Sequence, residues 1–365
     1  MGLSLEPRPV PSRAMQWVSP LLALLGTAVF AGLLLLWLGK EPGQGLRVFF
    51  LTPMSSLRGW SEIGLRMTPL LLCALGLALC YRANVWNIGA EGQLVVGGIA
   101  GGAVALLAGA QSPAGFFVLV LLGGGVAGAA WGGLIAWLRD RFHANEILVS
   151  LMLTYIAQLL LMYLVHGPLK DPNGYNFPYS ATFEAAALVP LILAPTRLNL
   201  GLPLALVAAL LMALFLWRAF AGFRLQVAGQ APRAAAYAGF DSRRGLWLSL
   251  TVCGALAGLA GALEVAGPIG QLTPSISPGY GFSAIIVAWL GRLNPLGCVV
   301  AAWVLSVVTI GGELAQSRMG LPNALSGVLQ GVLLLVLLAW DTLVTQRVAW
   351  RDIRTSVATA GVAER

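Results

Sequence analysis

Long apolar runs separated by short polar segments follow one another along the whole chain. Most runs are close to the 20 or so residues that a helix needs to cross about 30 Å of hydrocarbon. Backbone groups in lipid must find hydrogen-bond partners within their own segment, so the runs should be helices. The pattern predicts an all-α polytopic membrane protein with about ten transmembrane helices, at 20–38, 62–82, 88–109, 114–138, 146–166, 199–217, 245–265, 282–292, 295–312 and 323–340.

Composition supports this prediction. Hydrophobic residues make up 58% of the 365 residues, and charged residues make up only 10%, whereas a soluble domain carries about 25% charged residues. The alternating patterning of membrane β-strands is absent, which argues against a β-barrel. The run at 282–292 is too short to cross a membrane alone.

The net charge of +8 reflects Lys and Arg residues that cluster between the apolar runs. With the N-terminus placed inside, fifteen of the 22 basic residues fall in inside segments and seven in outside segments. This asymmetry follows the positive-inside rule, so both termini are expected in the cytoplasm and no nucleic-acid partner is implied. The predicted organisation is a cytoplasmic segment at 1–19, one transmembrane domain at 20–340 and a cytoplasmic tail at 341–365. The first run has no cleavage motif after it, so we expect it to be retained as a helix.

Each half of the chain has one glycine-rich apolar run that opens with polar residues. In the first half NVWNIGAEGQ opens the run at 88–109, and in the second GPIGQLTPSISPGYGFS opens the run at 282–292. Paired interrupted spans are typical of inverted-repeat transporters, so we expect inverted-repeat organisation with interrupted helices. Glycines four residues apart, such as Gly97 and Gly101 or Gly254 and Gly258, predict close packing of helix backbones.

Polar residues at the starts of these spans are candidates for a translocation pathway. Glu91 has two explanations. A carboxylate near a helix N-terminus is stabilised by free N–H groups and the helix dipole, but an intramembrane ionisable group also often marks a pathway. Ser150, Thr154 and Gln158 are spaced by four and are expected on one face, toward the bundle interior or a cavity. The candidates are Asn87, Glu91, Gln93, Asn145, Glu146 and Ser150.

Two connections stand out for their length. The outside loop 167–198 is rich in Pro and aromatic residues, and could dock a partner, cap a pore or simply connect two spans. The inside loop 218–244 contains GQAPRAAAYAGF. Pro232 suits the first position of a helix, the alanines favour helix and Gly239 suits the left-handed stop. The loop should therefore form a short helix that another surface can approach closely, although an amphipathic helix at the membrane interface is an alternative.

Several chemistries are missing from the sequence. No G-x-x-x-x-G-K-[ST] motif is present, so the chain has no ATP site of that type. The four cysteines, Cys73, Cys80, Cys253 and Cys298, form no C-x-x-C pair, and packing explains them better than metal binding or disulfides. No catalytic constellation is visible. Two rival classes remain open: a secondary transporter driven by an ion gradient, and a membrane enzyme acting on lipid.

Four stretches in this order, NIGAEGQ, ANEILVSLMLTY, GQAPRAAAYAGF and PGYGFSAIIVAWLGRLNPLG, resemble the permease subunits of bacterial ABC importers for nucleosides and simple sugars. The resemblance covers roughly 60–340. It implies a pore in the bacterial plasma (inner) membrane that is formed with a second permease, commonly a paralogue, although a homodimer is an alternative. It also implies two separate ATPase subunits that hold ATP and Mg²⁺, and a periplasmic or lipid-anchored substrate-binding protein. This chain itself would bind no cofactor or metal and would not be an enzyme.

The resemblance also assigns roles to residues. The stretches around Asn87 to Gln93 and around Asn294 would line or frame the translocation path. The GQAPRAAAYAGF loop would be the coupling helix that docks into the ATPase and switches the pore between inward-facing and outward-facing forms. Its implied coupling residues are Gln230, Pro232, Arg233, Ala234, Ala235, Tyr237, Ala238 and Gly239.

Overall fold

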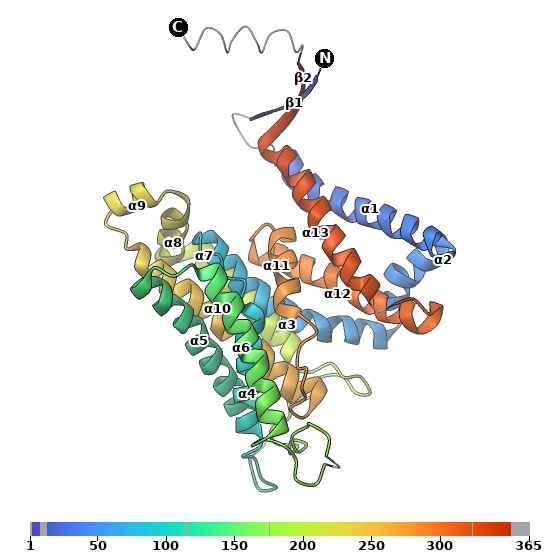
Figure 1. Cartoon of the computed structure of the whole chain (residues 1–365), viewed down its shortest axis with the longest axis vertical. Helices are drawn as coiled ribbons and strands as arrows, with labels where there is room; N and C mark the ends of the chain where they lie inside the picture. Colours follow the sequence, from blue (N-terminus) through green and yellow to red (C-terminus); the bar gives the residue numbers. More distant parts are fainter. Residues whose placement is uncertain (1, 8–12, 114, 175, 323, 352–365) are drawn as a thin grey trace. The chain divides into compact units, whose positions relative to one another are not determined.

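Figure 1 shows a computed structural model of the chain, which describes residues 2–7, 13–113, 115–174, 176–322 and 324–351. Within these residues, eight helices are long and apolar enough to cross a membrane. This confirms the prediction of an all-α polytopic membrane protein. The chain divides into two compact units, Met1–Leu51 with Gly312–Arg365, and Thr52–Gly311.

The first unit pairs described segments near the start of the sequence with described segments near its end. Helix α1 lies beside α13 (Figure 1), and a methyl group added to Gly26 of α1 would lie 2.9 Å from Val336 Cγ1 of α13. A small antiparallel ribbon, not expected from the sequence, pairs the first residues with the last described ones. The elements are β1 (Gly2–Pro7), α1 (Arg13–Trp37), α2 (Pro42–Leu46), η1 (Arg47–Leu51), the end of α12 (Pro295–Met319), α13 (Ala324–Thr345) and β2 (Gln346–Arg351).

The second unit is built around α3, whose side chains are nearly all buried from Ile63 to Cys80. Helices α7, α10 and α11 pack on it. The elements of this unit are η2 (Thr52–Met54), α3 (Leu57–Arg82), α4 (Ala90–Ala105), α5 (Phe117–Phe142), α6 (Glu146–His166), α7 (Gly201–Arg218), α8 (Phe220–Gln230), α9 (Pro232–Tyr237), α10 (Ser242–Glu264), η3 (Val265–Ile269), α11 (Tyr280–Leu290) and the first part of α12.

Glycines bring α4, α5 and α10 into backbone contact. A Cβ atom on Gly97 of α4 would overlap the backbone of Gly258 on α10, and one on Gly128 of α5 would lie 2.7 Å from the Cα of the same Gly258. The close packing predicted from the glycine spacing is therefore confirmed. It allows three membrane helices to interlock without large side chains between them.

Both predicted interruptions are present. Residues 83–89 are not helical and lead into α4, and residues 270–279 are not helical and lead into α11. The resulting helices, of 16 and 11 residues, are shorter than the other spans. The inverted relation between the two halves stays a prediction.

The loop predicted at 218–244 differs from expectation, because it contains a second helix, α8. Gly222 and Gly229 lower the helix propensity of this segment, which hides the helix in the sequence. In the structure, a Cβ on Gly222 would lie 3.0 Å from Leu216 Cα and one on Gly229 would lie 3.0 Å from Ala83 Cα. Tertiary packing therefore both requires the glycines and holds the helix.

Candidate functional site

Asn87 connects three helices from inside the second unit. Its Nδ2 donates to Gln93 Oε1 of α4 at 3.3 Å and to Cys253 Sγ of α10 at 3.2 Å. Its Oδ1 accepts from the Gly89 N–H at 2.9 Å, and its carbonyl accepts from the Tyr81 hydroxyl of α3 at 3.1 Å. The side chain is completely buried. A buried amide with its groups paired in this way holds the chain in one arrangement where it enters α4.

Glu91 lies where the two interrupted helices meet. Its Oε2 accepts a hydrogen bond from the Gly281 N–H in the first turn of α11, at 2.7 Å, and the residue is only 2% exposed. A Cβ atom on Gly281 would overlap the backbone of Glu91, so the starts of α4 and α11 are in direct contact. The carboxylate is thus held by the N-terminus of the neighbouring helix, where unpaired N–H groups and the dipole favour negative charge.

The polar face of α6 packs on the start of α4. Ser150 Oγ accepts from the Ile88 N–H at 3.3 Å. Cβ atoms on Gly89 and Gly92 would lie 2.8 Å from Ser150 Cβ and 2.7 Å from Thr154 Cα. Gln158, however, is exposed, so it does not lie in the bundle interior of this chain, and a position toward a cavity stays a prediction. Residues four apart drift by about 40° around a helix with 3.6 residues per turn, which carries Gln158 away from α4.

The structure therefore separates the predicted pathway residues into two sets. Asn87, Glu91, Gln93 and Ser150 come together around the start of α4. The other three lie at helix starts. Asn145 Oδ1 caps α6 through the Ile147 N–H, Glu146 pairs with Arg139 at 2.7 Å, and Asn294 Oδ1 accepts from the Leu296 N–H at the start of α12. A pathway role for any of the seven stays a prediction.

The short helix expected in the inside loop is present as α9. It begins at Pro232 and ends at Tyr237. Gly239, which was predicted to adopt a left-handed conformation after the helix, has a φ of 74°. Only Ala235 is buried, whereas Tyr237 is 98% exposed. Gln230 is the last residue of α8 and does not belong to α9. The other predicted coupling residues and Gln230 are all exposed: Gln230, Pro232, Arg233, Ala234, Tyr237, Ala238 and Gly239.

An aromatic cluster adjoins α9, and the Phe240 N–H of this cluster donates to the Ala235 carbonyl of α9 at 2.9 Å. Arg224 of α8 lies over the rings of Phe220 and Phe240, with 4.2 Å and 5.5 Å between its guanidinium carbon and the ring centroids. Phe240 follows α9 and meets Phe220 edge to face at 6.0 Å. Such contacts contribute roughly 0.5–1 kcal/mol each at exposed sites, so α9 is presented on an ordered base.

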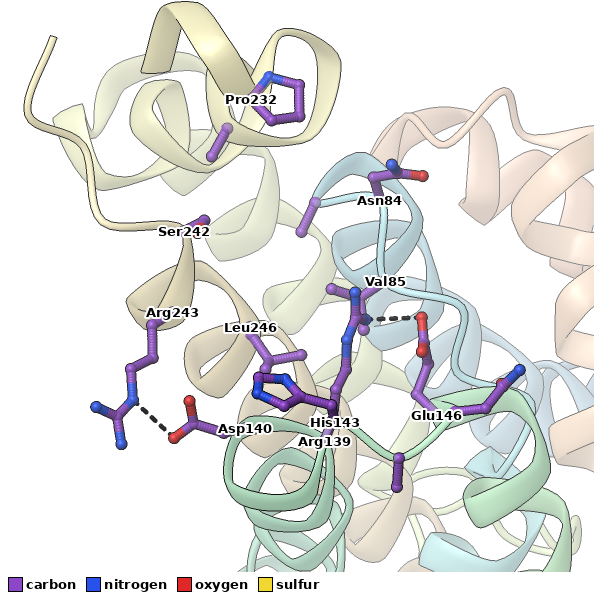
Figure 2. Close-up of a pocket in the computed structure, with 14 residues that line it drawn as sticks. Asn84, Val85, Arg139, Asp140, His143, Glu146, Pro232, Ser242, Arg243 and Leu246 are labelled. Atoms are coloured by element: carbon purple, nitrogen blue, oxygen red, sulfur yellow. Dashed lines mark hydrogen bonds and ion pairs between the residues drawn. The ribbon is translucent and has the colours of Figure 1, made fainter. Parts of the chain in front are cut away.

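A cavity of about 640 Å³ opens beside α9, and Figure 2 shows the residues that line it. We call it the α9 crevice. Its lining residues are Ala83, Asn84, Val85, Arg139, Asp140, His143, Ala144, Asn145, Glu146, Ala228, Pro232, Ser242, Arg243 and Leu246. Two ion pairs lie in its walls, Arg139 with Glu146 and Arg243 with Asp140, each at 2.7 Å. In Figure 2 His143 lies between them.

The family of branched-chain amino acid transport system permease components matches residues 60–338 of the chain. The chain belongs to this permease family. The match spans both interrupted helices, α9 and most of the membrane helices, so the candidate sites described above are part of the family's shared region.

Relatives with assigned roles agree with the family. The permease is 34% identical to the glucose ABC transporter permease protein TsgB13 of Haloferax volcanii, over 92% of this chain and 90% of the relative. It is 30% identical to the guanosine ABC transporter permease protein NupP of Bacillus subtilis, over 87% and 91% of the two chains. A second Bacillus subtilis protein, the guanosine ABC transporter permease protein NupQ, is 25% identical over 64% and 75%. No solved structure gives a significant match.

These findings decide between the classes left open by the sequence. They support a permease of an ABC transporter over an ion-coupled transporter or a lipid-modifying enzyme. They agree with the resemblance of the four motifs. They also make the permease a multi-pass membrane protein, in line with its eight long apolar helices among the described residues.

One polar cluster of the permease was missed from the sequence. Arg66 of α3 donates to the Tyr280 hydroxyl at the start of α11, and that hydroxyl donates to Glu264 Oε1 at the end of α10, at 3.5 Å. Tyr280 and Glu264 are buried. The available signal was Arg66 itself, a single basic residue inside the apolar run at 62–82. Its partner is 214 positions away, so no local pattern could pair them.

The loop 167–198 of the permease is anchored to the interruption before α11. Ser180 exchanges two hydrogen bonds with the backbone of Leu272, at 3.0 and 2.8 Å, and the Phe183 N–H donates to the Gly270 carbonyl at 2.9 Å. The loop is therefore more than a tether between two helices. Whether it docks a partner or caps a pore stays a prediction.

Proposed function

We propose that the permease forms, with a second permease subunit, the translocation pathway of an ATP-binding cassette importer for nucleosides or simple sugars. A substrate-binding protein delivers the ligand, and separate ATPase subunits drive transport. The substrate class is supported by relatives named for glucose and guanosine transport. The second permease is supported by NupP and NupQ, two permeases of one organism that both resemble this chain.

The observation that carries the ATPase assignment is the geometry of α9. The helix stands on an aromatic base, exposes small side chains and Tyr237, and offers room for a partner surface to approach its backbone. The alternative, a helix lying in the membrane interface, would present large apolar residues instead. ATP and Mg²⁺ belong to the partner in this proposal, and the permease binds no cofactor or metal of its own.

The orientation follows from charge. The α5–α6 connection, which follows Arg139 and Arg141, and the basic loop 218–244 lie in the cytoplasm with both termini, as the positive-inside rule predicts. The importer is located in a bacterial plasma membrane, with the loop 167–198 on the outer side. The α9 helix then faces the compartment that holds ATP.

Helix α10 transmits the motion of α9 in this mechanism. Helix α10 begins at Ser242, four residues after Ala238, which caps the end of α9. The Asp241 side chain caps the start of α10 by accepting from the Arg243 N–H at 2.9 Å. Further along, Cys253 accepts from Asn87 at the entry to α4, and beyond η3 the chain leads into α11. A shift of α10 therefore reaches both interrupted helices. ATP binding and hydrolysis would alternate their arrangement and open the pathway to each side in turn.

The buried lining fits a neutral, hydroxyl-rich ligand better than an ion. The groups gathered at the start of α4 are mainly amides and hydroxyls, and the Gln93 Nε2 is a buried donor without a hydrogen-bond partner among the described residues. A site of this kind binds through hydrogen bonds to hydroxyl and amide groups of the ligand. We place the ligand path along Asn87, Glu91, Gln93 and Ser150.

The proposal is tested by purifying the tagged permease gently from native membranes and identifying associated proteins by mass spectrometry. An ATPase subunit, a second permease and a binding protein are expected. The binding protein is then screened with nucleosides and sugars by calorimetry. A permease that emerges alone after mild crosslinking, and that carries out ion-driven uptake in liposomes, would contradict the proposal.

Docking at α9 is tested by a pair of substitutions. Ala234→Trp places a large side chain on the exposed surface and should prevent ATPase association while the permease folds normally. Ala235→Trp places the same side chain at the buried position and should disturb the loop itself. Normal ATPase association of the Ala234→Trp variant would exclude α9 as the docking element.

A further inference from the structure

The size of α9 sets a limit on what it can do alone. A stable protein interface buries roughly 800 Å² on each partner and involves about 20–30 residues a side. The helix has six residues, one of which is buried. If an ATPase subunit docks here, neighbouring surface must supply most of the interface. The α9 crevice is one hollowed surface that adjoins the helix, because Pro232, the first residue of α9, is part of its wall.

The chemistry of the α9 crevice favours a polar protein segment as its occupant. Figure 2 shows charged side chains of both signs around the opening: the Arg243–Asp140 pair on one side and the Arg139–Glu146 pair on the other. Trp247 Nε1 also donates to Asp140 Oδ2 at 3.1 Å, which holds that carboxylate in the wall. A surface of mixed sign suits a peptide with donors and acceptors, whereas an acyl chain would need an apolar lining.

The crevice also leads directly to the first interrupted helix. Its wall includes Asn84 and Val85, in the connection that enters α4. Glu146 Oε1, which pairs with Arg139, also lies 3.4 Å from the Trp86 N–H of the same connection. A partner group that binds Arg139 in place of Glu146 would therefore change the contact between Glu146 and the Trp86 N–H. Trp86 directly precedes Asn87 in this connection. This route does not pass through α10.

We propose that the α9 crevice receives a polar segment of the ATPase subunit, as a second coupling contact beside α9. The proposal rests on the proposed function, since it needs an ATPase partner. The α9 helix passes motion to α10, and the crevice passes it to α4 through Glu146 and the connection at 83–89. The first interrupted helix then has two links to the partner, one through α10 and Asn87 and one through the crevice.

Thiol labelling tests this in the assembled transporter. The natural cysteines are buried, so an introduced surface thiol is the one expected to react with a maleimide. Ser242→Cys changes one exposed atom in the crevice wall, Tyr237→Cys reports on α9, and Asn173→Cys in the loop 167–198 is the control. Labelling rates are measured for the whole complex and for the complex stripped of ATPase, both without binding protein. We expect at least tenfold protection by the ATPase at 242 and 237, and none at 173.

The outcomes separate the two proposals. Protection at 237 with unchanged labelling at 242 overturns the crevice contact and leaves the ATPase docking at α9 intact. Protection at 242 without protection at 237 supports the crevice and removes α9 as a docking site. If no ATPase associates with the permease at all, the proposed function itself fails.

A blocking experiment gives a second readout. A bulky polyethylene-glycol maleimide is attached at Ser242→Cys in the stripped complex, and the ATPase is then added back. We expect at least tenfold weaker rebinding than with the same adduct at Asn173→Cys. Equal rebinding of both adducts would overturn the crevice contact.

Discussion

Helices α4 and α9 are both short and rich in small residues, yet they use those residues in opposite ways. In α4 the glycines and alanines are mostly buried, and Gly97 lies against the backbone of α10. In α9 only Ala235 is buried and Tyr237 is almost fully exposed. Small residues thus serve two purposes in one molecule. In α4 they bring the chain's own helices into backbone contact, and in α9 they leave an exposed surface to which, in the proposed function, an ATPase subunit docks.

The largest effect is expected where α4 meets α10. Gly97→Leu puts a branched side chain into a backbone–backbone contact that no rotamer can avoid. Overpacking of this kind should lower the free energy of unfolding by about 3 kcal/mol. Thermal unfolding of the purified permease in detergent measures the loss. The control is Gly331→Leu on α13, where no neighbouring atom lies within 4 Å of an added Cβ, and it should shift stability by no more than about 0.5 kcal/mol. Equal stability of the two variants would contradict the packing argument.

A smaller loss is expected from the buried amide at the entry to α4. Asn87→Ala removes the partners of Gln93 Oε1 and of the Gly89 N–H inside the bundle. Leaving such groups unsatisfied should cost about 2 kcal/mol, measured by the same unfolding assay. Cys253→Ser keeps an acceptor for the Asn87 amide and should remain close to the parent. If Asn87→Ala is as stable as the parent, the connection at 83–89 is held by packing alone.

Glu91→Gln distinguishes the two explanations for the buried carboxylate. Glutamine keeps an oxygen that can accept from the Gly281 N–H but loses the charge at the N-terminus of α11. Stability should fall by about 1 kcal/mol through the lost dipole interaction. Substrate uptake by the reconstituted transporter is then compared at equal protein level. Unchanged uptake assigns Glu91 to holding α4 and α11 together, whereas a tenfold loss assigns it to the pathway.

The smallest effect on stability is expected at α9. Tyr237→Ala removes a side chain that is 98% exposed, so the free energy of unfolding should change by less than about 0.5 kcal/mol. Loss of a large aromatic anchor from an interface typically costs at least about 2 kcal/mol, or roughly 30-fold in affinity for the ATPase subunit. Titration of the ATPase against the permease measures it, with Tyr179→Ala in the loop 167–198 as control. If the Tyr237→Ala variant binds the ATPase with unaltered affinity, α9 does not serve as a partner surface in the way that α4 serves as a packing surface.

Predictability from sequence follows the range of the interactions. The bounds of α9 could be predicted because Pro232 and Gly239 act on their own backbone. The interruptions before α4 and α11 could be predicted because glycine and polar residues collect there. Helix α8 was missed because its glycines, read alone, disfavour a helix, and Arg66 could not be paired with Tyr280 because the two are far apart in the chain.

The candidate pathway shows the same division. The residue types were recognised, but their contacts were not. Asn87 bonds Gln93, Ser150 accepts from the Ile88 N–H and Glu91 accepts from the start of α11, whereas Asn145 and Asn294 cap helix starts and Glu146 pairs with Arg139. Gln158 was assigned to the same face as Ser150 by spacing alone, and helical drift turns it outward. Spacing along one helix predicts which residues share a face within a turn or two. Which of those residues are buried depends on where a second helix makes contact.

The sequence by itself determined that the permease crosses a membrane with many helices, that two of its spans are interrupted, and that a short helix follows Pro232. These features depend on hydrophobic length, on charge at the membrane surfaces and on backbone preferences, all of which act within a few residues. Only the tertiary structure decided that Glu91 accepts from the start of α11, that Asn87 joins α4 to α10, and that a polar crevice opens beside α9. Those contacts join segments up to 190 positions apart, and their energies exist only after the helices have packed.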